Sequence, residues 1–199
     1  MAKISWKPGN MIYPLPAVMV TVGDGKGNDN IITVAWTGTV CTNPPMAYIS
    51  VRPERYSYNL IKETKEFVIN LTTKDLCFAT DYCGVKSGRD IDKFKECNLT
   101  PIKVEGLKHA VGIEQSPLIL GCKVKRIIEL GSHDMFLAET VSVMAQDKLF
   151  DNKDKLCLDR AGLIGYIHGE YFETGRKLGF FGWSVASKKV LKRRKTRSR

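Results

Sequence analysis

The stretch NIITVAWTGTVCTNPPMAYISVRPER, residues 30–55, decides the fold of this chain. Residues 31–36 and 46–51 are apolar and rich in β-branched side chains, which favours two buried strands over helices. Between them lies a loop of small residues that ends in the NPP sequence at 43–45. Hydroxyls and approachable backbone N–H groups between two apolar walls are typical of a ligand pocket. We therefore expect this loop to hold a ligand.

The second strand is followed at once by side chains that suit a phosphate. Ser50, Arg52, Arg55 and Ser57 combine guanidinium groups with hydroxyls, which are good donors to phosphate oxygens. Residues 55–64 have apolar side chains at helical spacing, and a helix N-terminus here would direct its N–H groups at the same place. The alternative is that the arginines are ordinary surface cations and that Ser57 is a helix cap. The adjoining pocket loop favours the anion site.

Composition indicates one folded domain with a short basic tail. The chain has 199 residues, 43% of them hydrophobic and 26% charged, which is ordinary for a globular domain. We expect that domain to span residues 1–187. The tail, residues 188–199, contains eight cations and no acid, so it accounts for most of the net charge of +10. A like-charge run of this kind is usually disordered and binds polyanions nonspecifically. It lacks the aromatic residues of a base-stacking surface.

The location of the protein is predicted from three features. No apolar run approaches the roughly 20 residues that a membrane span needs. The N-terminal sequence has neither the apolar core nor the cleavage site of a signal peptide. The six cysteines form no CxxC pair, so we expect reduced thiols that are mostly core residues. We expect a cytoplasmic protein that does not bind membranes.

The remaining segments are mostly typical of antiparallel strands. Residues 23–28 have the glycines of a phosphate-binding loop, but a strand follows them where that motif needs a helix, so a hairpin turn is predicted. The turn at residues 131–134 joins two long strands into a meander. We expect strands over residues 17–22, 66–71, 118–129, 135–144 and 163–166, an extended arm over 1–16, helices over 55–64 and 76–82, and a helix end at 83–84.

A third short helix is expected after Ser87, which can cap it. Lys93 lies within this predicted helix. A lysine in such a position is usually solvated, and the alternative is that it contacts a ligand in the pocket.

Common hydrolytic sites find no support in the sequence. The three histidines, at positions 109, 133 and 168, are far apart, and none belongs to an HExxH motif. No GxSxG sequence is present, so a serine hydrolase lacks its usual signature. What remains is a cradle for a cofactor that would carry the chemistry itself.

Four segments in this order resemble the flavin reductase-like, FMN-binding split-barrel family, and within it the flavoredoxin-type proteins. They are residues 22–28, residues 30–57, residues 87–94 and residues 131–134. The similarity covers roughly residues 10–185. It implies a mainly β single domain with short helices, built as a six-stranded antiparallel split β-barrel of Greek-key type. It also implies FMN as cofactor and a homodimer with the flavin close to the subunit interface.

The resemblance assigns roles to individual residues. The phosphate would bind Ser50, Arg52 and Ser57, and Arg55 is a further candidate from its position. Lys93 and the segment that begins at Ser87 would pack beside the flavin. The isoalloxazine would be lined by Ala35, Trp36 and Thr37, with backbone N–H groups near Gly38 and Thr39 and with Cys41 or Thr42 nearby.

His133 would stand beside the open face of the flavin, where the electron donor binds. The alternative is a turn histidine bonded only to backbone. The turn here is Gly-Ser-His-Asp, whereas the commoner family form has an acid just before the histidine. Taken as a whole, the resemblance implies an FMN-dependent oxidoreductase or electron carrier whose donor is NAD(P)H or a redox protein. The alternatives are a non-catalytic barrel that binds another ligand and a nucleic-acid-binding module that uses the tail.

Overall fold

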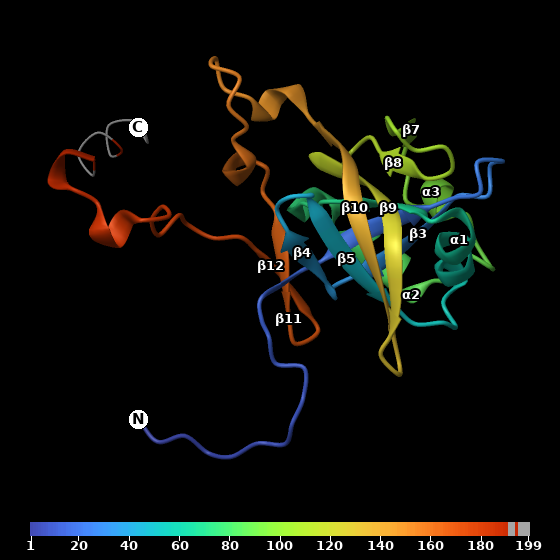
Figure 1. Ribbon diagram of the computed structural model, residues 1–199, viewed down its shortest axis with the longest axis horizontal. Helices are drawn as coiled ribbons and strands as arrows, with labels where there is room; N and C mark the ends of the chain where they lie inside the picture. The colour runs from blue at the N-terminus through green and yellow to red at the C-terminus, as the bar shows by residue number, and fades with distance from the viewer. Residues whose placement is uncertain (191–193, 195–199) are drawn as a thin grey trace.

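The computed structural model describes residues 1–190 and 194, and a curled antiparallel sheet of seven strands dominates it (Figure 1). Its strands follow the order β3 (Asn30–Val34), β2 (Val18–Val22), β6 (Glu66–Asn70), β9 (Leu118–Glu129), β10 (Asp134–Ala145), β5 (Met46–Val51) and β4 (Thr37–Cys41). The predicted mainly β, antiparallel fold is confirmed. The main sheet has one strand more than expected, because part of the predicted pocket loop is β4.

β4 forms because its backbone pairs with β5. Thr37 lies opposite Ile49, and Thr39 lies opposite Ala47. The sequence of β4 predicts a loop because the segment is short and contains Gly38. Its threonines and Val40, however, are β-branched and suit a strand.

The link between β3 and β4 brings the two edges of the curled sheet towards each other. These two strands are consecutive in the chain, yet they form the two edges of the main sheet. Only Ala35 and Trp36 separate them. Three Cα–Cα steps span at most about 11 Å, so the two edges must approach each other at this link. The Ser50 N–H donates to the Trp36 carbonyl at 2.9 Å, which attaches the link to β5.

The side chains of β2 face two different cores. Val18, Val20 and Val22 belong to the core inside the curled sheet. Met19, on the opposite face, belongs to a second core that lies under α2 and α3. Alternate residues of a strand point to opposite faces, so a strand covered on both sides is buried at every position and mostly apolar. β2 is buried along its whole length for this reason.

Three α-helices lie around the sheet: α1 (Tyr56–Thr64), α2 (Cys77–Val85) and α3 (Lys93–Glu96). α2 continues through Gly84 to Val85, so the predicted helix end at residues 83–84 is wrong. The cap of α3 is Asp92, whose side chain accepts a hydrogen bond from the Lys95 N–H, and not Ser87. Ser87 lies in the turn before it, where its Oγ accepts from the Arg89 N–H at 3.2 Å.

A second, smaller sheet covers one end of the main sheet (Figure 1). It has three strands in the order β1 (Leu15–Pro16), β11 (Ile164–Ile167) and β12 (Glu170–Glu173). A two-stranded sheet is formed by β7 (Pro101–Lys103) and β8 (Val111–Ile113), and short 3₁₀ helices are Lys74–Leu76, Asp147–Leu149, Leu158–Arg160 and Trp183–Val185.

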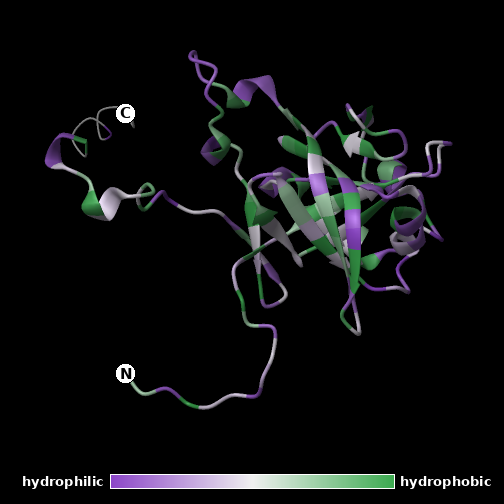
Figure 2. Cartoon of the chain, viewed as in Figure 1, coloured by the Kyte–Doolittle hydropathy of each residue, from purple (hydrophilic) through white to green (hydrophobic). Residues whose placement is uncertain are grey.

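The N-terminal residues and the described segment after β12 extend away from the sheets (Figure 1). The two terminal segments carry exposed large apolar side chains, among them Trp6 at 71% and Leu178 at 89% exposure. Figure 2 shows hydrophobic stretches through the main sheet, interrupted by hydrophilic bands on β9 and β10, and many hydrophilic loops. Residues 188–190 are helical. The predicted disorder of residues 191–193 and 195–199 concerns positions outside the described residues. No helix in the described part of the chain has the length and apolar character to cross a membrane.

Candidate functional site

Two adjoining cavities form one cleft beside β3. The larger, of about 460 Å³, extends from β3 to α2 and the β11–β12 hairpin. The smaller, of about 270 Å³, lies between α1, the end of α2 and the turn before α3. Ile32, Arg52, Arg55 and Gly84 line both cavities. The cleft therefore has a wide compartment and a narrow compartment that meet at two arginines.

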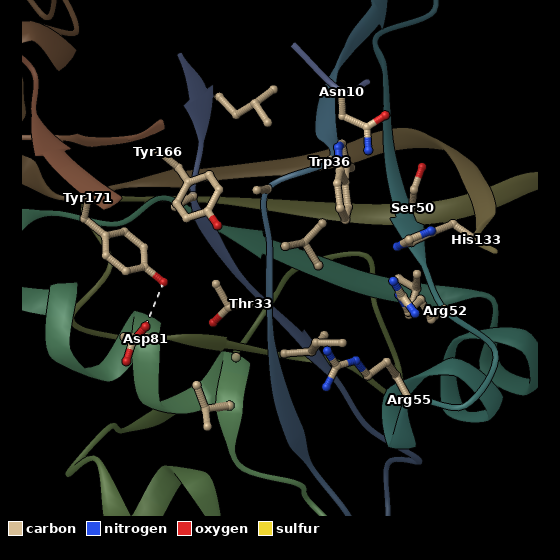
Figure 3. A pocket seen from close by; sticks show the side chains of 18 of the residues that line it. Asn10, Thr33, Trp36, Ser50, Arg52, Arg55, Asp81, His133, Tyr166 and Tyr171 are labelled. Carbon is tan, nitrogen blue, oxygen red and sulfur yellow. Dashed lines mark hydrogen bonds between the residues drawn. The ribbon is translucent and has the colours of Figure 1, made fainter. Parts of the chain in front are cut away.

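Six of the predicted site residues line the wide compartment: Ala35, Trp36, Ser50, Arg52, Arg55 and His133. Apolar side chains of β3 and β5, such as Ile32, Val34 and Val51, contribute to the same walls. Figure 3 shows the arginines and His133 on one side of this compartment and two tyrosines on the other. Its walls combine apolar and aromatic side chains with polar groups, which suits a planar ring system with polar edges.

The narrow compartment is rich in donors for an anion. Arg52, Arg55, Ser57, Ser87 and Lys93 all line it, and all were predicted site residues. α1 begins at this compartment without a side-chain cap and without an acid in its first turn. Its first N–H groups and the positive end of its dipole are thus open to a bound anion.

Asn30 and Gly88 shape the narrow compartment, and the sequence did not reveal either role. The Asn30 side-chain amide donates to Ser57 Oγ at 2.8 Å, so the serine hydroxyl proton can itself be donated to a ligand. A Cβ atom on Gly88 would lie only 2.2 Å from Asn30 Oδ1 and 2.8 Å from the Tyr56 ring. Only glycine lets the turn approach Asn30 this closely. In the sequence, the glycine that follows Ser87 is the sign of this close approach.

Lys93 is buried and has a structural role. Its Nζ donates to the Ile31 carbonyl at 2.6 Å and to the Cys83 carbonyl at 2.7 Å. Burial lowers the pKa of this ammonium. Those two carbonyls use two of its three N–H donors, so the third can be directed at a ligand in the narrow compartment.

His133 lies at the entrance of the wide compartment. Its ring meets the Trp36 ring edge to face, with centroids 4.8 Å apart, and its Nδ1 lies 2.9 Å from Ser132 Oγ. Burial, and then the charge of Arg52, lower the pKa of the imidazole. The neutral form is therefore favoured near neutral pH.

A buried pair next to His133 fixes the start of β10. The Tyr58 hydroxyl donates to the Asp134 carboxylate, and both side chains are buried. This bond, followed by burial, raises the pKa of Tyr58 to about 12. The phenol thus stays a donor, and α1 holds the residue that follows His133.

The predicted site residues between Thr37 and Thr42 do not line the cleft of this chain. Thr37 is buried and its hydroxyl donates to the Tyr48 carbonyl at 2.6 Å, while Cys41 Sγ contacts the Asn43 carbonyl at 3.4 Å. Gly38 packs against the Tyr48 ring. Thr39 and Thr42 are exposed. Their proposed contact with a flavin remains a prediction.

The wall opposite the arginines was not predicted at all. It is formed by Asp81, Tyr166 and Tyr171 (Figure 3), and Tyr13 lines the same compartment. These residues come from the N-terminal arm, from α2 and from the C-terminal hairpin, and only the three-dimensional fold brings them together. No local motif marks them in the sequence.

The comparisons with known proteins agree with this architecture. Residues 10–175 match the flavin reductase like domain family, and the chain belongs to that family. The flavoredoxin of Desulfovibrio vulgaris (Miyazaki F) is 26% identical, with a TM-score of 0.83 over 90% of this chain and 97% of that chain. Flavoredoxin from Methanosarcina acetivorans is 25% identical, with a TM-score of 0.83 over 94% of this chain and 100% of that chain.

A sequence relative also covers more than two thirds of the chain. A protein of Archaeoglobus fulgidus is 28% identical over 142 residues, which are 71% of this chain and 78% of that protein. The split-barrel fold and the family resemblance that the sequence indicates are thus confirmed.

Proposed function

We propose that the cleft binds FMN and that the protein is a flavin-dependent oxidoreductase or electron carrier. The observation that carries this proposal is the division of one cleft into a wide compartment with apolar and aromatic walls and a narrow compartment rich in cationic and hydroxyl donors. FMN has the same division, because a planar isoalloxazine is joined through ribityl to a phosphate dianion. Bound FMN would supply the hydride or electron chemistry, and the protein would supply binding, orientation and electrostatics.

The narrow compartment would hold the phosphate. Arg55 and Arg52 stand where the two compartments meet, and Ser57 lies inside the first turn of α1. Guanidinium groups and helix N–H groups both bind phosphate oxygens well. Ser87 and Lys93 complete the donor set on the opposite wall.

The wide compartment would hold the ring. Ala35 and Trp36 lie in the link between the edge strands, where the Ala35 carbonyl and the Thr37 N–H are bonded to each other at 3.0 Å within a bend. His133 would contact the donor at the open face as a neutral imidazole. That donor is NAD(P)H or a redox protein, and the electrons leave to an acceptor by the same face.

We also propose that the chain forms a homodimer. The extended ends carry Ile4, Trp6 and Phe181, whose exposures are 83%, 71% and 107%. In a homodimer the partner would cover part of this apolar surface. Light scattering should give twice the chain mass, and a monomeric mass at micromolar concentration would remove this part of the proposal.

Titration of the purified chain with FMN and with riboflavin tests the central proposal. We expect FMN to bind, with a change in its absorbance band near 450 nm. We also expect FMN to bind more tightly than riboflavin. Absence of FMN binding would overturn the proposal. Equal affinity for the two flavins would mean that the narrow compartment does not hold the phosphate.

A further inference from the structure

The wall of the wide compartment that faces away from the arginines is an aromatic surface. Tyr166 and Tyr171 are directly paired across the β11–β12 hairpin, and their rings meet with centroids 5.5 Å apart at 60°. Both tyrosines line the compartment. Directly paired residues of a hairpin lie on one face, so the two rings form a continuous surface.

A carboxylate belongs to the same wall. The Tyr171 hydroxyl donates to Asp81 Oδ1 of α2 at 3.2 Å, as the dashed line in Figure 3 shows. Burial, and then Asp81, raise the pKa of Tyr171 to about 12, so the phenol stays neutral and continues to donate. None of the ion pairs among the described residues involves Asp81. Asp81 is exposed on α2 and lines the compartment, so its charge acts on a ligand there through a partly aqueous surrounding.

The two sides of the compartment thus have opposite charge. Arg52, Arg55 and His133 stand on one side, and Asp81 stands with Tyr171 on the other (Figure 3). The phosphate and the ribityl of a flavin would satisfy the cationic side. FMN has no cationic group that would pair with the Asp81 carboxylate, so the aromatic side can serve a different ligand.

We propose that Tyr166, Tyr171 and Asp81 form the subsite of the second reactant and that this reactant is an uncharged or cationic planar aromatic. The proposal rests on the proposed binding of FMN at the cationic side. Aromatic rings prefer edge-to-face or offset contact with other rings, which the tyrosine pair offers. The Asp81 carboxylate repels an anionic ring of the same shape. Asp81 is therefore a specificity-determining residue.

The size of the discrimination follows from Coulomb's law. Two like unit charges about 6 Å apart, at an effective dielectric constant of about 40, repel each other by an energy that corresponds to an about tenfold weaker binding of the anionic ligand. That dielectric constant lies between the values for bulk water and for a pair near a protein surface. An uncharged ring avoids this loss and keeps the stacking.

Benzamide and benzoate provide the test, because they have nearly the same shape and differ in charge. Their binding to the FMN-loaded chain is measured by isothermal titration calorimetry. We expect benzamide to bind about tenfold more tightly than benzoate. In Asp81→Asn this preference should fall to about twofold or less, while the FMN affinity stays unchanged. Asp75→Asn, which removes an exposed carboxylate outside the compartment, should keep the tenfold preference.

Tyr171→Phe and Tyr171→Leu separate stacking from charge. The phenylalanine variant keeps the ring and should retain both benzamide binding and the preference. The leucine variant should weaken both probes about equally. If FMN binds and Asp81→Asn leaves the preference unchanged, the subsite is overturned while the proposed function stands. If the aromatic-wall variants weaken FMN itself, the wall serves the flavin. If FMN does not bind, the proposed function fails and this inference fails with it.

Discussion

Replacement of Arg55 by alanine is the most direct test of the phosphate compartment. Arg55 lines both compartments, and among the described residues it belongs to no ion pair. Arg52 differs, because its Nη1 lies 3.4 Å from Glu54 Oε1, with exposures of 48% and 64% for the two side chains. Such an exposed pair is weak, yet it competes with a ligand for the same guanidinium. Arg55 is therefore the freer cation.

The expected loss is that of a hydrogen bond to a charged group, about 1.5–3 kcal/mol. This corresponds to a rise in the Kd for FMN of roughly 12- to 150-fold. Riboflavin has no phosphate, so its Kd should change by less than about twofold. Glu54→Gln should act in the opposite direction, because it removes an anion from the wall of the narrow compartment.

Quenching of flavin fluorescence at constant ionic strength measures both affinities. Arg126→Ala removes the same type of charge from an exposed position of β9 and serves as the control. Equal losses for FMN and riboflavin would refute the reasoning, because they would indicate that Arg55 acts through the fold. An unchanged FMN affinity in Arg55→Ala would mean that the phosphate binds elsewhere.

The remaining predictions concern stability and reactivity. Tyr58→Phe leaves the buried Asp134 carboxylate without its phenol donor, so urea unfolding should show a loss of about 1.5–3 kcal/mol. The lowered pKa of His133 means that its stabilising contribution is complete above the ordinary histidine pKa and is lost as pH falls through and below that value. His133→Asn should therefore flatten the dependence of the urea midpoint on pH in that acidic window, and an unchanged slope would contradict the assignment. Burial raises the pKa of the Cys83 and Cys122 thiols to about 12, so both should react slowly with Ellman's reagent at pH 8 until the chain is unfolded. Cys83→Ser and Cys122→Ser should each remove one slowly reacting thiol.

Strands were predictable where the pattern of buried residues is unambiguous. β2, β5 and β9 lie close to their predicted bounds, because β-branched apolar runs have few alternatives. β4 was missed, since its small residues also suit a loop and its pairing with β5 depends on the curl of the whole sheet. The boundary of α2 was misjudged for a related reason. Gly84 usually ends a helix, but here it packs against Thr33 of β3 and the helix continues.

The two sides of the cleft differ in how far the sequence revealed them. Arg52, Arg55 and Ser57 are neighbours in the chain, so one motif exposes the anion site. Asp81 and Tyr171 are 90 residues apart and meet only in the folded structure. Lys93 shows a third situation, since its position in the chain was informative but its bonds to two carbonyls depend on packing.

The two-residue link between β3 and β4 constrains length more than composition. Successive side chains of a strand alternate between faces, so one residue inserted next to Ala35 or Trp36 would invert β4 or shift its register against β5. Substitution of the Trp36 side chain leaves the backbone path intact, because its attachment to β5 uses the carbonyl. An engineer could therefore vary the side chains of the link to change the reactant that meets the cleft. Changing the number of its residues would instead disturb the approach of the two edge strands.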